Sequence, residues 1–169
     1  IRAKDGTRLA ARLLVPSNRP ELPVMATAVQ AQLRGIGVDL GVDVGEFSAI
    51  PEAVRNGTMQ MALLARTYAN VPDPIGTIIP DFTGERSVWG TLNWPGRDRM
   101  RALTDEYVAG FDTDRAPALR DAITRLINDD MPVIPVSWFE HTVAVSNRVR
   151  TVTVDPFEMR YYTDRVTWA

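Results

Sequence analysis

The sequence contains no cysteine and only one histidine, His141. Without cysteine the chain cannot form disulfides or thiolate metal sites. A lone imidazole cannot build a transition-metal site from protein ligands unless carboxylates join it. We therefore expect no bound metal and no cofactor. The absence of disulfides suits an exported bacterial protein, and it suits many cytosolic proteins equally well.

Long apolar runs and blocks of one charge are also missing. No stretch is long enough to span a bilayer, and no signal peptide is visible. The net charge is −2 and no basic block occurs, which excludes a nucleic-acid surface. The chain opens at Ile1 without a methionine, so we expect it to be a piece of a longer protein.

The chain itself has 169 residues, of which 45% are hydrophobic. That is enough for one globular domain, and we expect residues 1–169 to form it. In the first half the pattern predicts a strand at 9–15, a helix from Val24 and a strand at 38–44. A helix at 47–55 and a buried, central strand at 59–65 follow. The expected buried face of the first helix holds Met25, Ala28, Val29, Gln32, Leu33 and Ile36.

The second half is richer in helix. Asp73-Pro74 is typical of a helix start, and residues 82–95 look irregular. Two helices follow, with stripes Met100, Leu103, Tyr107, Val108, Phe111 and Leu119, Ala122, Ile123, Leu126, Ile127. Thr113 or Asp114 should cap the second one, and residues 132–168 should form strands. The fold class is therefore α/β, a mixed βαβ sheet flanked by helices.

Residues 56–81 organise this reading. An apolar strand leads into a polar and aromatic loop and then to a helix start at Asp73. In α/β folds, ligands bind beyond the carboxyl ends of the strands. We therefore expect the binding chemistry between Thr67 and Asp73.

The order of motifs resembles a known family. The stretches are VPSNRP at 15–20, LRGIGVDL at 33–40, GTMQMALLARTYANVPDP at 57–74, RDRMRALTDEY at 97–107, INDDMPVIPVSW at 127–138 and RVRTVTVDPF at 148–157. Together they are similar to the second lobe of extracytoplasmic solute-binding proteins of family 5, the peptide and nickel class that serves ABC importers. The resemblance covers nearly the whole chain.

This resemblance implies a type II periplasmic-binding-protein lobe, inserted into a first lobe that the chain lacks. It implies no catalysis. The protein would capture a small solute, a peptide or a metal chelate, and deliver it to an ABC permease. It would act as a monomer in the periplasm or elsewhere outside the cytoplasm. Whether the full-length protein carries a lipid anchor stays open.

The resemblance also suggests ligand contacts. Arg19-Pro20 matches the place where dipeptide-binding members grip a carboxylate, and an arginine fork suits that task. Asn70 stands where those members carry an aspartate for the ligand's ammonium group, and an amide cannot neutralise that charge. Thr67 replaces the usual tryptophan of this loop, with Tyr68 beside it. The predicted ligand-binding set is Arg19, Tyr68, Asn70, Trp94 and His141.

Other polar and aromatic residues have simpler readings. Asp73 suits a helix cap better than a ligand contact. Trp89 and Trp94 could line a pocket or fill the core beneath their own loop, and Asn93 is a weaker candidate. Arg97 could bind an anion, or pair with Asp98 or Glu85. Asp129 and Asp130 end a helix, where acids oppose the helix dipole.

Two other functions stay open from the sequence. One is a stand-alone α/β hydrolase that uses His141 with Ser137 or Ser146, although no Gly-x-Ser-x-Gly elbow occurs. The other is a domain that only binds other proteins. For His141 itself, the simplest reading is a strand-edge residue with a satisfied hydrogen bond.

Overall fold

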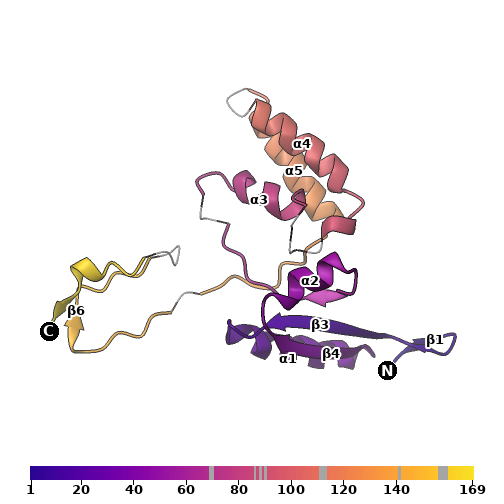
Figure 1. The fold of residues 1–169 in the computed structure, drawn as a ribbon, viewed down its shortest axis with the longest axis horizontal. Helices are drawn as coiled ribbons and strands as arrows, with labels where there is room; N and C mark the ends of the chain where they lie inside the picture. The colour runs from indigo at the N-terminus through magenta and orange to yellow at the C-terminus, as the bar shows by residue number, and fades with distance from the viewer. Residues whose placement is uncertain are drawn as a thin grey trace.

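The computed structural model describes residues 1–68, 71–85, 87, 89, 91–110, 114–140, 142–155 and 160–169. Figure 1 shows a small sheet with its helices, a separate group of helices, and a C-terminal stretch that reaches away from both. A short hairpin of β1 (Ala3–Lys4) and β2 (Thr7–Arg8) precedes the sheet. Among the described residues no helix is long and apolar enough to cross a membrane.

The central sheet is parallel and has the order β4-β3-β5. β3 (Ala10–Pro16) pairs with β4 (Asp39–Gly45) along its whole length. The predicted strand at 59–65 is much shorter, because only β5 (Met61–Ala62) pairs with β3. The expectation that it is central is wrong. β3 lies in the middle of the sheet. Just before β5, Oε1 of Gln60 accepts a hydrogen bond from the backbone N–H of Arg12 at 2.7 Å.

Helix α1 (Glu21–Gly35) packs against β3 and β4 and begins earlier than predicted. Pro23 lies in its first turn, where a proline costs no intrahelical hydrogen bond. The predicted buried face is confirmed in part, because Met25, Val29 and Leu33 pack against the core of the sheet. Leu22 and Ala26 are buried, whereas Ile36, predicted to be inside, is 58% exposed. Ala28 and Gln32 are exposed as well.

Helix α2 (Ala49–Arg55) ends at Asn56-Gly57, as predicted. Gly57 has a φ of 71°, a left-handed conformation that glycine adopts without a steric penalty. The core of this first part consists of Leu13, Val15, Leu22, Ala26, Leu40 and Leu63.

The helical group contains α3 (Ile75–Phe82), α4 (Arg97–Ala109) and α5 (Ala116–Asp130), with a short 3₁₀ turn at Thr91–Asn93. Figure 1 shows α4 and α5 side by side. The predicted stripe of α5 is confirmed: Leu119, Ile123 and Leu126 are buried, with Ala122 and Ile127 partly so. In α4, Met100 and Tyr107 are buried, but Val108 is 59% exposed. Phe111 lies outside the described residues.

The predicted cap of α5 is wrong for Asp114. The residue before the helix is Arg115, whose side chain makes no capping hydrogen bond, and Pro117 lies within the first turn. A proline at the first helical positions sets the helical φ by itself. Thr113, the other proposed cap, is not among the described residues.

Most of the predicted C-terminal strand structure is absent from the described part of residues 132–168. Only β6 (Val149–Arg150) and β7 (Thr167–Trp168) pair, with a 3₁₀ turn at Thr163–Arg165 between them. β-branched residues favour an extended backbone, but a strand also needs a neighbour for its hydrogen bonds. Trp138 in this stretch is fully exposed.

Candidate functional site

Arg19 lies in the short turn between β3 and α1, beyond the carboxyl end of the middle strand. Its Nη1 atom is 3.6 Å from Oε1 of Glu21, an ion pair too long for a hydrogen bond. Its guanidinium carbon lies 5.8 Å from the centroid of the Phe139 ring. This contact joins the first loop to the segment that follows α5.

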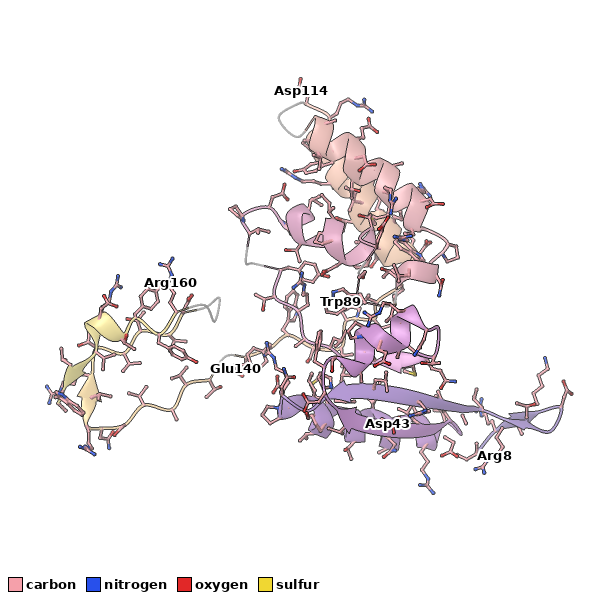
Figure 2. All side chains as sticks on the ribbon, viewed as in Figure 1. Arg8, Asp43, Trp89, Asp114, Glu140 and Arg160 are labelled. Carbon is pink, nitrogen blue, oxygen red and sulfur yellow. The ribbon has the colours of Figure 1, made fainter. Side chains whose placement is uncertain are left out.

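Residues 131–140 carry the chain from the helical group past the sheet. Figure 2 shows Glu140 beside the end of the sheet at which β3 ends. Parallel α/β sheets bind ligands at this end, beyond the carboxyl ends of the strands. The structure therefore brings a C-terminal segment, as well as the loops after the strands, to the predicted ligand side.

Tyr68 follows β5 in a loop that an ion pair ties to α3. Arg66 donates two hydrogen bonds to Asp81, from Nε to Oδ2 at 2.8 Å and from Nη2 to Oδ1 at 2.9 Å. Asp81 is only 5% exposed. A two-bond pairing of this kind fixes the direction of both side chains, so the start of the loop is held in place.

The charges of this ion pair affect the pKa of the Tyr68 hydroxyl. Burial raises the pKa of Tyr68 above its ordinary value of 10.0, the Asp81 carboxylate raises it further, and the Arg66 guanidinium offsets part of the rise. Tyr68 is therefore a neutral hydrogen-bond donor at physiological pH. With 36% of its surface exposed, it can present that donor to a solute.

Trp94 packs within the helical group. Its ring meets Phe82 edge to face, with centroids 6.2 Å apart, and its indole N–H donates to Oδ2 of Asp130 at 3.0 Å. This bond gives Asp130 a partner at the end of α5, where its charge opposes the helix dipole. The only donor of the Trp94 ring is thus used inside the protein.

Asp73 lies two residues before α3 and caps its start as predicted, because its Oδ1 accepts the Ile75 N–H at 3.1 Å. Its other oxygen, Oδ2, accepts a hydrogen bond from the Tyr107 hydroxyl. Nη2 of Arg120 lies 3.7 Å from the same oxygen. Burial raises the pKa of Asp73, but the hydrogen bonds from Tyr107 and the Ile75 N–H, with the charge of Arg120, bring it below the ordinary value of 3.8. A shallow depression of about 270 Å³ lies beside this group.

Tyr107 joins these three residues. Its hydroxyl donates to Asp73 and accepts from Nε of Arg120 at 2.8 Å. The hydrogen bond to Asp73 raises the pKa of Tyr107, and burial adds to the rise. The arrangement fits a structural link between α3, α4 and α5, because each polar group has a partner within it.

The remaining candidates have the following places. Arg97 donates to the Thr83 carbonyl at 3.1 Å, and Arg101 donates to the same oxygen at 3.0 Å, so both cap the end of α3. Arg97 is not paired with Asp98 or Glu85 in the described part of the chain. Trp89 is partly buried and Asn93 is exposed. Ser137 and Ser146 are also exposed, and the Ser146 hydroxyl accepts the Arg148 N–H at 3.3 Å.

Asn70 and His141 lie outside the described residues, so their predicted roles stay predictions. Within the ranges that are described, no group of three or more histidine and acidic side chains could hold a metal ion. Arg19 contacts Glu21 and Phe139, whereas Tyr68 and Trp94 both lie near the C-terminal end of α3, at Asp81 and Phe82. The described residues of the predicted set thus lie in two places, Arg19 beyond the carboxyl end of β3 and the other two beside α3.

Sequence reasoning missed Glu21, Arg66, Asp81 and Phe139. Arg66 and Asp81 are 15 residues apart, and a buried carboxylate with a guanidinium partner gives no periodic signal in a sequence. Arg66 does open the polar loop after β5, which is a weak pointer. Phe139 was unforeseeable, because its contact with Arg19 depends on how the chain returns from α5.

Comparison with known proteins gives matches among solved structures. No protein-family model matches the sequence, and no curated protein matches it at a significant level. NikA from Brucella suis, solved in complex with Fe(III)-EDTA, matches with a TM-score of 0.80 and 22% identity. The match covers 100% of this chain and 34% of that one.

Two further structures agree. A dipeptide-binding protein from Pseudoalteromonas sp. SM9913, in complex with Met-Leu, matches with a TM-score of 0.65 and 20% identity, over 89% of this chain and 30% of that one. The oligopeptide-binding protein AppA from Bacillus subtilis, in complex with a nonapeptide, matches with a TM-score of 0.66 and 17% identity, over 99% and 33%.

At these identities the matches show a shared fold and nothing further. A shared fold does not by itself fix function. The chain spans about a third of the length of the matched structures. The predicted α/β class, a βαβ sheet flanked by helices, is confirmed, and the resemblance to the peptide and nickel class is supported at the level of the fold. The chain therefore shares its fold with about one third of NikA and of the other two matched structures.

Proposed function

We propose that this chain is the second, ligand-binding lobe of a solute-binding protein that serves an ABC importer. The observation that carries the proposal is the match of the entire chain to NikA at a TM-score of 0.80. The solute would be a small peptide or a metal chelate, since the matched structures hold Fe(III)-EDTA, Met-Leu and a nonapeptide. The protein would perform no chemistry on it.

The mechanism follows from having two lobes. A solute that contacts both lobes binds the closed form more tightly than the open one, so it shifts the population toward closure. The closed protein would then deliver the solute to an ABC permease at the membrane. Such a protein works outside the cytoplasm as a monomer, and residues 1–169 would be one lobe of it.

The proposed contacts are Arg19, Tyr68, Asn70, Trp94 and His141. Arg19 supplies a cation beyond the carboxyl end of β3, and Tyr68 supplies a neutral hydroxyl on a residue that is 36% exposed. A guanidinium and a phenol together suit a ligand that carries a carboxylate. Trp94 would contribute only the faces and edges of its ring, because its N–H already binds Asp130.

The test is a thermal-shift screen on the full-length parent protein. The panel contains short peptides, amino acids, sugars and nickel–chelator complexes. A ligand at one hundred times its dissociation constant stabilises the folded state by roughly 2.7 kcal/mol, so a true solute should raise the melting temperature clearly. We expect peptides or chelates to give the shift and sugars to give none.

Two results would count against the proposal. If no compound of the panel raises the melting temperature, the receptor role is left without support. Turnover of ester or peptide substrates, lost on replacing His141, would instead establish the hydrolase alternative. Peptide binding despite Asn70 would show that another group neutralises the ligand's ammonium.

A further inference from the structure

The Arg19 guanidinium contacts a neighbour in sequence, Glu21, and a residue 120 positions away, Phe139. The Glu21 carboxylate lies 3.6 Å from Nη1, and the Phe139 ring lies with its centroid 5.8 Å from the guanidinium carbon. A cation within about 6 Å of an aromatic centroid is attracted by the negative face of the ring. The ring therefore restrains a side chain that would otherwise sample many rotamers.

Restraint by a ring suits a residue that must bind an anion. An arginine loses rotamer entropy when its long side chain is fixed. If the loss has already occurred before binding, the ligand gains that affinity. A cation–π contact draws on the charge of the guanidinium rather than on its N–H groups, so it is compatible with a two-bond pairing to a carboxylate.

The surroundings of Phe139 argue against a simple packing role. The ring is 55% exposed, and it belongs to neither of the two clusters of buried residues. It lies on the extended segment after α5, which passes the end of the sheet (Figure 2). A half-exposed ring that touches a cation at the ligand edge has a more specific use than filling space.

We propose that Phe139 is a positioning residue that orients Arg19 for the carboxylate of the solute. The inference rests on the proposed function, because it assumes that a solute occupies this edge of the sheet. It goes further by assigning a role to a residue outside the predicted set. The carboxylate is already part of the proposed function, and the new element is the side chain that prepares Arg19 for it.

The experiment uses the full-length parent and two probes, dialanine and dialanine amide, which differ only in the ligand's carboxylate. Dissociation constants are measured by calorimetry for Phe139→Leu and for the matched Phe139→Tyr, which keeps the ring. We expect Phe139→Leu to weaken dialanine about threefold to tenfold, the size of a cation–π contact. Binding of the amide should not change, and Phe139→Tyr should bind both probes like the parent.

A second measurement separates positioning from packing. In an Arg19→Ala background, Phe139→Leu should have no further effect on dialanine, because the group that it orients is gone. Equal weakening of both probes, or an undiminished effect without Arg19, would assign Phe139 a structural role instead. Failure of dialanine to bind the parent would overturn the inference alone, since the wider solute screen decides the proposed function separately.

Discussion

Arg66 and Asp81 connect the loop after β5 to the buried side of α3. The carboxylate is almost fully buried and accepts two hydrogen bonds from a guanidinium that is itself partly in solvent. A buried charge that loses its partner keeps its desolvation cost without compensation. The pair thus anchors the loop that carries Tyr68.

Replacing Arg66 by alanine should lower the free energy of unfolding by roughly 1.5–3 kcal/mol, the range for hydrogen bonds to a charged group. Chemical denaturation measures it. Arg125→Ala is the matched control, because Arg125 and Asp121 are 4.0 Å apart and both exposed, and it should change stability by no more than about 0.5 kcal/mol. Arg66→Met combined with Asp81→Leu should recover part of the loss, and an equal effect of Arg66→Ala and Arg125→Ala would contradict the assignment.

Asp73 makes the stability of the helical group depend on pH. The pKa of its carboxyl in the folded chain lies below the ordinary value of 3.8. Folding therefore favours the charged form. The contribution of Asp73 to stability is fully present above the unfolded pKa and is lost as the pH falls through the folded one.

The variant Asp73→Asn should accordingly be less stable than the parent near neutral pH, with a difference that shrinks below about pH 4. Denaturation curves at several pH values between 7 and 3 provide the measurement. Asp121→Asn, at an exposed pair, serves as a control and should give a small difference throughout. A gap between Asp73→Asn and the parent that is the same at every pH would show that the charge is not the cause.

At the scale of elements, the start of α4 is fitted to the end of α5. Gly96 precedes α4 and is buried, with the Trp94 ring and the Asp130 carboxylate against it. A Cβ atom there would lie 2.6 Å from Oδ2 of Asp130 and would also meet the ring. Glycine is thus needed here for space, since its φ of −75° suits any residue.

The substitution Gly96→Ala should cost about 1–3 kcal/mol, as overpacking does in well-packed sites. Gly35→Ala at the end of α1 is the control, because nothing lies within 4 Å of its added Cβ. That change should be neutral or should stabilise by about 0.4–1 kcal/mol. Thermal and chemical unfolding compare the two, and similar costs at both positions would refute the crowding argument.

At the scale of the molecule, most of the buried hydrophobic residues described belong to two clusters. One lies between the sheet and α1, and the other lies among α3, α4 and α5. Ile123 is fully buried in the second, and Leu13 is 3% exposed in the first. Separate clusters allow separate local unfolding.

Ile123→Ala should cost about 2–5 kcal/mol and should lower hydrogen-exchange protection in α4 and α5 more than in β3. Leu13→Ala, the matched variant, should give the reverse pattern. Native-state hydrogen exchange resolves the two regions by amide. If either variant lowered protection everywhere to the same degree, the two clusters would form a single cooperative unit.

The sequence by itself determined what depends on local pattern. The strand that became β3, the α2 stop at Asn56-Gly57, the buried stripe of α5 and the role of Asp73 at the start of α3 all follow from periodicity, turns and capping. These features involve residues close together in the chain, so nearby letters specify them. The order of the motifs also predicted the fold that the matched structures confirm.

Only the tertiary structure decided which elements meet. The apolar character of residues 59–65 predicted a central strand, but pairing left β5 short and at the edge. The valines of the C-terminal stretch predicted strands, yet few of its described residues found a partner to pair with. The contacts Arg66–Asp81, Trp94–Asp130 and Arg19–Phe139 join residues 15, 36 and 120 positions apart. A contact across such a span depends on how the whole chain packs, because no local pattern encodes it.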